Sequence, residues 1–224
     1  MATGCFSSHR SEKHYYTLYA NNQKGISDIR LVGTAYVRNL NAESAYDKFQ
    51  IVVRTSPYEL SYRESQVWAV RPNRMISDQI ARVLVERRVF DTVSRELGST
   101  RPDIIIGGEL HAIEIYDSQD VWFAHLAIGL HAIDFRSGEV LGSYSFDDRK
   151  QVRSLDFSTA SRALSELLSK AIDEAILSLT EAVRARPEFI SPQDTHPQEK
   201  DKTPSQTKKP PAPKPLMVPE PRPE

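Results

Sequence analysis

The sequence contains very little cysteine: Cys5 is the single one in a chain of 224 residues. One thiol excludes an internal disulfide, and it excludes the Cys-rich zinc sites that support many small domains. A chain of this length can bury a hydrophobic core without such support. The sequence also lacks an apolar run of about 18 residues, so no segment as written is expected to span a bilayer.

The charge is balanced as well. The chain has 29 Lys and Arg residues against 30 Asp and Glu residues, which gives a formal net charge of −1. Such a chain has no basic field of the kind that gathers nucleic acid. We therefore expect no nucleic-acid partner.

Signatures of the common catalytic sites are missing. The sequence has no G-x-S-x-G, Walker A, G-x-G-x-x-G or H-E-x-x-H motif. Gly107-Gly108 lies inside a strand pattern and leads into no helix, so it predicts close backbone approach in a sheet and not a phosphate site. We expect no enzymatic activity, no cofactor and no metal.

Two histidines, His111 and His125, are the candidates for chemistry. If a bulge lies near residue 111, His111 is placed across from His125 on one face of the sheet. A two-histidine metal site or a catalytic site there stays open, beside the interpretation of two polar side chains on the less buried face. Glu109 and Glu114 straddle the same bulge, so their spacing defines no general acid/base pair.

The last 38 residues differ from the rest in composition. Residues 187–224 hold 11 of the 14 prolines, no glycine, and one aromatic residue, Phe189. A segment with so little apolar surface cannot offset the entropy of ordering, so we expect a disordered tail. The predicted organisation is a polar tether over residues 1–14, one domain over residues 15–186, and the proline-rich tail.

Alternating apolar and polar residues predict β-strands in the first part of the domain and again after residue 100. Segments with this pattern lie at residues 15–20, 29–38, 49–55, 58–62, 90–93, 103–117, 122–132 and 140–146. We expect six or seven of them to form strands. Residues 39–47 are polar and predict a loop.

Two stretches with apolar residues at helical spacing predict helices. The first covers residues 74–88, with Asn73 as its N-cap; the second starts at Asp156 or Ser158 and ends at Pro187. The predicted fold class is α+β: a mixed, largely antiparallel sheet with two helices packed on one face.

One strand changes its pattern halfway. Ile104 and Ile106 share one parity, whereas Ile113 and Ile115 have the opposite one. Such a slip is what a β-bulge produces, so we predict a bulge near residues 111–113. The next two strands are predicted to form a meander with this one, joined at a hairpin loop where Gly138 is free to adopt positive φ.

The residues before Cys5 are Ala2-Thr3-Gly4, small residues like those that end a bacterial lipobox. In such a site the peptide bond before the cysteine is cut and the thiol receives a diacylglycerol. The hydrophobic leader is not in the sequence as written, so we expect either a start further upstream or a trimmed precursor. Residues 6–13 are polar, as in the tether of an anchored lipoprotein.

The sequence resembles a known family, the ABC-type transport auxiliary lipoproteins. This family includes the paraquat-inducible protein C lipoproteins. The features that carry the resemblance are Gly4-Cys5 with its tether, residues 15–18 (YYTL), residues 46–54 with their YxxxxIVxR pattern, and residues 62–75 (YRESQVWAVRPNRM). The resemblance covers about residues 5–184. The missing leader and the proline-rich tail depart from the family pattern.

The resemblance implies an outer-membrane lipoprotein that faces the periplasm, anchored through Cys5. Its role would be that of a non-catalytic docking component in a lipid transport system built around mammalian cell entry (MCE) domain proteins. The MCE-domain protein is then the expected partner, with Tyr58, Tyr62 and Trp68 as candidate contact residues. Burial of these aromatic residues in the core is the other interpretation, and a homo-oligomer stays open.

Two other functions compete with this one. A periplasmic carrier of lipid or of another apolar ligand would need a cavity between sheet and helices large enough for an acyl chain. An enzyme would place its site on the outward face of the sheet, around His111 and His125.

Overall fold

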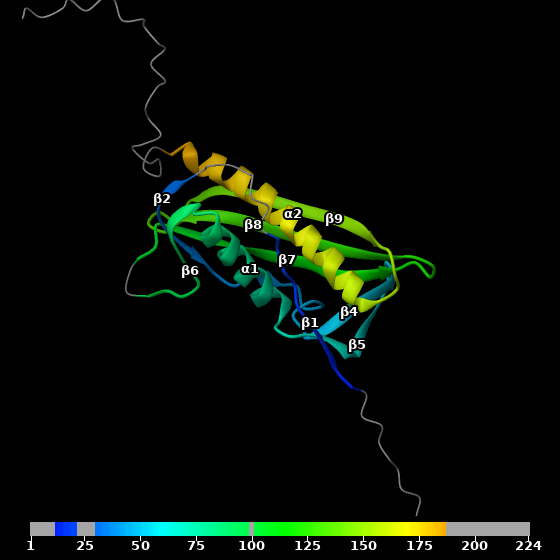
Figure 1. Ribbon diagram of the computed structural model, residues 1–224. Coiled ribbons are helices and arrows are strands. Elements are labelled where there is room, and N and C mark those ends of the chain that lie inside the picture. Colours follow the sequence, from blue (N-terminus) through cyan, green and yellow to red (C-terminus); the bar gives the residue numbers. More distant parts are fainter. Residues whose placement is uncertain (1–11, 22–29, 99–100, 187–224) are drawn as a thin grey trace, which may run out of the picture. The chain divides into compact units, whose positions relative to one another are not determined.

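The computed structural model describes residues 12–21, 30–98 and 101–186 (Figure 1). Cys5 and the proline-rich tail lie outside these residues, so the predicted anchor and the predicted boundaries stay predictions. The elements in chain order are β1 (His14–Tyr16), β2 (Leu31–Val37), β3 (Asn41–Ala42), β4 (Gln50–Ser56), β5 (Glu59–Trp68), α1 (Pro72–Glu86), β6 (Phe90–Ser94), β7 (Ile104–Asp117), β8 (Trp122–Asp134), β9 (Val140–Val152) and α2 (Phe157–Arg184).

Strand β7 organises the sheet. One of its edges pairs along its whole length with β8, which in turn pairs with β9, and both pairings are antiparallel. The other edge takes β2, β3 and β4 in succession, each parallel to β7. The remaining strands extend this side, since β5 pairs antiparallel with β4, and β1 and β6 lie beside β5 and β2.

The described sheet has nine strands, two more than the upper estimate from the sequence. Its longest ladders are antiparallel, and both helices lie on one face (Figure 1), so the predicted α+β class and the mixed, largely antiparallel sheet are confirmed. The predicted bulge is confirmed too: the register of β7 against β8 shifts between Leu110 and Ala112. Because of that shift, Ile106 and Ile113 both lie in the core, although their parities differ.

Helix α2 lies along the β7–β8–β9 part of the sheet and buries the stripe predicted from its sequence. Asp156 is its N-cap, and its carboxylate accepts a 2.8 Å hydrogen bond from the Thr159 backbone N–H. This cap satisfies one of the amide groups that a helix start leaves without an intrahelical partner. Pro187, the predicted stop, lies outside the described residues.

Helix α1 starts earlier than predicted, and Asn73 is not its N-cap. Arg71 takes that position without a side-chain hydrogen bond, and Pro72 follows at the first helical position, where its fixed φ is favourable. The Asn73 side chain instead donates to the Leu40 carbonyl over 3.2 Å. It therefore ties the helix to the loop after β2.

Other differences concern short strands and strand ends. Strand β1 covers only His14–Tyr16, while residues 17–21 leave the sheet. The predicted polar loop contains the two-residue strand β3, and β9 runs six residues beyond its predicted end at residue 146. No helix among the described residues is long and apolar enough to cross a membrane.

The glycine pair in β7 makes the close approach that the sequence predicted. A Cβ atom on Gly108 would lie 2.0 Å from the backbone oxygen of Gly129 on β8, and one on Gly107 would lie 2.2 Å from Nε of Arg38. Gly108 has no room for a side chain, because it meets backbone, whereas at Gly107 the flexible end of the Arg38 side chain would have to move.

We expect Gly108→Ala to lower the free energy of unfolding by about 2–3 kcal/mol, because backbone and not a flexible side chain must move. Gly98→Ala is the matched control, since a Cβ there meets no atom within 4 Å. Urea unfolding checks the prediction. Equal midpoints for the Gly108 variant and the wild type would contradict it.

Candidate functional site

The face of the sheet away from the helices carries a buried polar network centred on Glu114 of β7. This carboxylate is 2% exposed, and it accepts hydrogen bonds from the Tyr46 hydroxyl at 2.6 Å and from Arg54 Nε at 2.8 Å. His125 Nδ1 lies 3.0 Å from the same carboxylate, and His125 Nε2 lies 2.9 Å from Asp147. The network links β4, β7, β8, β9 and the loop before β4.

Burial alone would raise the pKa of Glu114, but the bonds from His125, Arg54 and Tyr46 outweigh it and hold that pKa at about 2. Burial would likewise lower the pKa of His125, yet its bonds to the Glu114 and Asp147 carboxylates raise it above 6.5. With a carboxylate on each ring nitrogen, both nitrogens donate, which is the imidazolium form. The network thus pairs the buried Glu114 and His125 with the partly exposed Arg54 and the exposed Asp147, and it joins four strands.

The structure separates the two histidines that were the candidates for chemistry. His125 lies opposite Glu114, whereas His111 sits at the bulge, next to Ala112, whose partner is Ala127. His111 Nδ1 lies 3.2 Å from Glu43. The predicted placement of His111 across from His125 is therefore wrong, because the bulge directs them to different carboxylates. The two histidines therefore cannot share one metal ion, and both His125 ring nitrogens already bond carboxylates, those of Glu114 and Asp147. Among the described residues no group of three or more His, Cys, Asp or Glu is arranged to hold a metal ion.

Glu109 is also separate from Glu114. It lies 3.9 Å from His111 Nε2 and is exposed, while Glu114 is buried in its own network. The two carboxylates share no reacting position, so they do not form a general acid/base pair with each other.

The three candidate contact aromatics have different environments. Tyr58, in the turn between β4 and β5, is 98% exposed, and Tyr62 on β5 is 39% exposed, with Lys48 over its ring. Trp68 is 1% exposed and belongs to the core, so in this fold it offers no contact area. The alternation at residues 58–62 did not reveal the burial of Trp68, because the strand is longer than this pattern. Trp68 is the last residue of β5, shortly before α1 begins.

Residues 17–21, which we call the N-terminal strap, lie extended between the two helices (Figure 1). Leu18 and Ala20 point inward and are buried. The backbone N–H groups of Tyr19 and Asn21 donate to Ser165 Oγ and Ser169 Oγ of α2, at 3.1 and 2.9 Å.

The other side of the strap is held by α1. The N–H groups of Leu18 and Ala20 donate to Met75 Sδ and Gln79 Oε1, at 3.2 and 3.0 Å. Arg82 donates to the Ala20 carbonyl and lies over the Tyr19 ring. The strand predicted over residues 15–20 is thus confirmed only as far as Tyr16, since beyond it helix side chains bond the backbone in place of a neighbouring strand.

The interior between the helices and the sheet is nearly filled. An apolar cavity of about 30 Å³ lies there, lined by residues such as Ile80, Leu84, Leu130 and Ile176. That volume is far below the 300 Å³ or more of typical ligand pockets.

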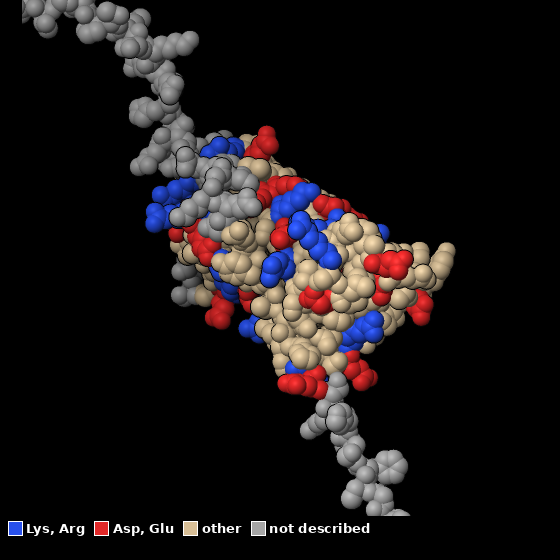
Figure 2. Space-filling view, turned by 45° about the vertical axis from the view of Figure 1, so that its right-hand side comes forward, with Lys and Arg blue, Asp and Glu red and all other residues tan. Residues whose placement is uncertain are grey.

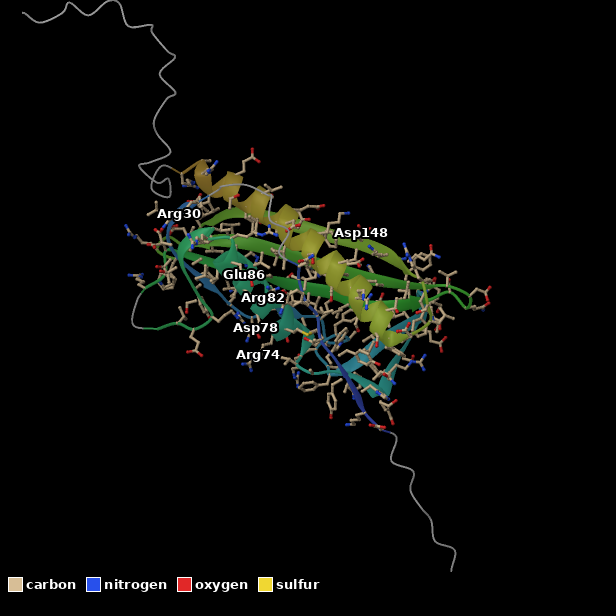
Figure 3. The ribbon with its side chains drawn as sticks, in the orientation of Figure 1. Arg30, Arg74, Asp78, Arg82, Glu86 and Asp148 are labelled. Atoms are coloured by element: carbon tan, nitrogen blue, oxygen red, sulfur yellow. The ribbon has the colours of Figure 1, made fainter. Side chains whose placement is uncertain are left out.

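Charged side chains cover the helix layer without separating by sign. In Figure 3 Asp78, Arg82 and Glu86 project from α1, and Arg82 pairs with Glu86 at 2.6 Å. Figure 2 likewise shows acidic and basic side chains mixed on the visible face. This face therefore favours no highly charged partner.

The stabilising effect of His125 should fade at alkaline pH. Because its pKa is raised in the fold, its contribution is complete below the unfolded value of 6.5 and is lost as the pH rises through the folded value. We expect the stability difference between the wild type and His125→Gln to shrink as the pH is raised above 6.5, measured by urea unfolding across the pH series.

His131→Gln is the matched control with the opposite sign. Burial, helped by Arg38, lowers the pKa of His131, so its contribution to stability grows as the pH rises towards 6.5. The interpretation of the network fails if both variants show the same dependence on pH.

The strap can be tested by hydrogen exchange. Ser165→Ala with Ser169→Ala removes the acceptors of the Tyr19 and Asn21 amides, so exchange at these two amides should accelerate about tenfold. The Leu18 and Ala20 amides, bonded to α1, should change less. Ser178→Ala on the same helix is the control. Unchanged exchange at Tyr19 and Asn21 in the double variant would count against the strap as a docked segment.

Comparison with solved structures supports the fold. A crystal structure of protein XCC0632 from Xanthomonas campestris superposes with a TM-score of 0.65 at 17% identity, covering 77% of this chain and 98% of that one. A protein described as uncharacterized gives a TM-score of 0.52 at 12% identity, over 79% of this chain and 98% of the other. At these identities the likeness shows the fold alone.

A PelC dodecamer from Paraburkholderia phytofirmans is a weaker match, with a TM-score of 0.40 at 13% identity. The match covers 62% of this chain and 86% of that one. Among curated proteins no relative matches the sequence. The family model described as the ABC-type transport auxiliary lipoprotein component matches residues 20–175, which is more than half of the chain and covers α1, the greater part of α2 and all strands but β1. The chain therefore belongs to the ABC-type transport auxiliary lipoprotein family.

Proposed function

We propose that this chain is the membrane-anchored, non-catalytic docking component of an ABC-type transport system that moves lipid between membranes through an MCE-domain protein. The match of the family model over residues 20–175 is the observation that carries the proposal. The MCE partner, the lipid cargo and the periplasmic face of the outer membrane are our extension of that membership.

The anchor in this proposal is Cys5. A lipoprotein cysteine carries more than one acyl chain, which suffices for stable attachment. Eight residues separate Cys5 from His14, the first residue of β1, so the tether reaches at most about 30 Å. The domain would thus stay close to the bilayer that holds it.

The strap supports a docking role, because only the short strand β1 lies between it and the tether. Its four consecutive amides are bonded alternately to α1 and α2, so the chain enters the fold through both helices and not through a loose loop. A displacement of the anchor would act on the helix layer as a unit. A rigidly held domain suits a component that positions a partner.

The carrier alternative requires space that the described interior lacks. An acyl chain needs a pocket of hundreds of Å³, and the cavity between helices and sheet holds about 30 Å³. In this conformation a lipid would have to displace core side chains such as Leu130 and Ile176. The docking role needs no such rearrangement.

Tyr58 and Tyr62 are the contact residues that we retain for the partner, since both expose ring surface on the β4–β5 hairpin. Exposed tyrosines supply large contact area at low cost in side-chain entropy, and they are enriched in interfaces. Trp68 is dropped from this set because it is buried.

The experiment expresses the native gene with its own upstream sequence in its host and follows the protein by cell fractionation. We expect the wild type in the outer-membrane fraction, and Cys5→Ser, expressed behind a leader whose removal does not need the cysteine, in the soluble periplasmic fraction. A photo-crosslinking residue in place of Tyr58 should capture the MCE-domain protein, while one in place of Val85, which is 55% exposed on α1, should not.

A Cys5→Ser variant that stays in the membrane fraction would refute the anchor. Crosslinks from position 58 that are no more frequent to the MCE-domain protein than those from position 85 would refute the proposed contact. An adduct of twice the chain mass would assign the hairpin to a homo-oligomer instead, and would likewise refute that contact.

A further inference from the structure

Strand β9 forms one border of the described sheet (Figure 1). Among the described residues it pairs with β8 alone, so the backbone N–H and C=O groups along its other side meet no strand. It has 13 residues, whereas β1 and β6, which lie at other borders of the sheet, have 3 and 5. A long free edge is a template on which a further strand can form hydrogen bonds.

Most of the devices that keep sheet edges apart are missing from β9. The strand contains no proline, and its register against β8 is continuous except for one shift at its first residues, near Ile133. No bulge therefore turns the second half of the edge away from a neighbour. The remaining device is charge, because four charged residues follow one another there: Asp147, Asp148, Arg149 and Lys150.

Two of these charges point to the helix layer and are paired with α2. Lys170 Nζ lies 2.8 Å from the Asp148 carboxylate, and Glu166 forms an ion pair with Lys150. Helix α2 thus compensates the charge on this face of the edge, one residue at a time.

The other two charges, Asp147 and Arg149, lie on the face away from the helices. Asp147 bonds His125, yet its side chain is 72% exposed. Arg149 is exposed as well, and its guanidinium lies 5.4 Å from the centroid of the Tyr116 ring. One acidic and one basic side chain are therefore presented side by side at the free edge.

Two copies of β9 can pair antiparallel around a two-fold axis perpendicular to the sheet. Residues that lie opposite each other then point to the same face, and because side chains alternate, the axis has to pass through a residue and not between two. An axis through Asp147 or through Arg149 sets that charge against its own copy on the outer face. An axis through Asp148 sets Asp147 of each copy against Arg149 of the other. The two Asp148 carboxylates that meet on the axis each have Lys170 as a counter-ion.

We propose that two copies of this chain join their β9 strands antiparallel around Asp148, so that the two sheets continue as one. Residues 144–152 of each copy pair, and the two α2 helices lie on the same face. Opposite charges across an antiparallel pair stabilise it and like charges destabilise it, so the order of charges selects this register over its neighbours. The interface rests neither on the anchor nor on the β4–β5 hairpin, and a failure of either proposal leaves the other standing.

The first test is sedimentation equilibrium of the full chain carrying Cys5→Ser, at chain concentrations up to about 1 mM, where we expect a reversible dimer. Asp147→Arg sets like charges opposite each other in both cross-strand pairs, and so does Arg149→Glu. Each variant should weaken the dimer about tenfold. Glu64→Arg, which reverses an exposed charge on β5, is the matched control and should dimerise like the wild type.

Mixing the two charge variants separates a lost interface from a folding defect. In an equimolar mixture of Asp147→Arg and Arg149→Glu, each basic edge meets an acidic one, so heterodimers should form with about the affinity of the wild type. A misfolded chain would not be restored by mixing.

Disulfide crosslinking locates the axis. In the Cys5→Ser background, Asp148→Cys should oxidise to a covalent dimer, because a residue on the axis lies about 5 Å from its own copy between Cα atoms. Ser145→Cys on the same strand is the control, since it lies opposite Gln151 and about 20 Å from its own copy. It should stay monomeric alone and crosslink when combined with Gln151→Cys.

The proposal is overturned if the chain sediments as a monomer at every concentration, or if the two charge variants dimerise like the wild type. It is also overturned if their mixture does not recover the dimer. Crosslinks through Ser145→Cys alone, with none through Asp148→Cys, would contradict the register.

Discussion

Burial of the α2 stripe against β7, β8 and β9 is the constraint on which the rest of the structure depends. The helix contributes fully or nearly fully buried residues along its whole length, from Ala160 to Val183. Strand β7 can present isoleucines to this helix layer in both of its halves only because the bulge after Leu110 reverses its parity. The same reversal puts Glu114 on the opposite face, where Tyr46 covers it. One backbone irregularity thus fixes both the apolar layer and the buried polar network.

A closed apolar layer moves function to the surface. The apolar cavity in the interior measures about 30 Å³, and the buried Glu114 on the outer face is paired with Arg54 and His125. The exposed features of the fold are the tyrosines of the β4–β5 hairpin and a hollow beside the strap. A component that docks and positions partners needs surfaces of this kind, and the family of auxiliary transport lipoproteins, to which the chain belongs, is consistent with it.

The sequence predicts the features that local pattern determines. The long helix, the meander, the bulge and the positive φ of Gly138, which is 74°, follow from periodicity and residue type within a few neighbours. The strap and the Glu114 network depend instead on partners far away in the chain: Tyr19 and Ser165 are 146 residues apart, and Tyr46 and Glu114 are 68 apart. The position of Glu114 between two isoleucines indicated a buried carboxylate that needs hydrogen-bond donors. The neighbouring sequence gave no information on which residues donate. The N-cap of α1 was missed because the helix already starts at Pro72. The expected cap, Asn73, therefore lies inside the helix, and Arg71 takes the N-cap position.

We expect the folded domain to carry no lipid cargo of its own, because the apolar cavity between the helices and the sheet measures about 30 Å³. Native mass spectrometry of the protein extracted from its host envelope tests it most directly. We predict a mass per chain equal to that of the processed chain plus covalently attached acyl groups, with no stoichiometric non-covalent lipid. A species that retains one bound phospholipid per chain would contradict the account, because the described interior has no room for it.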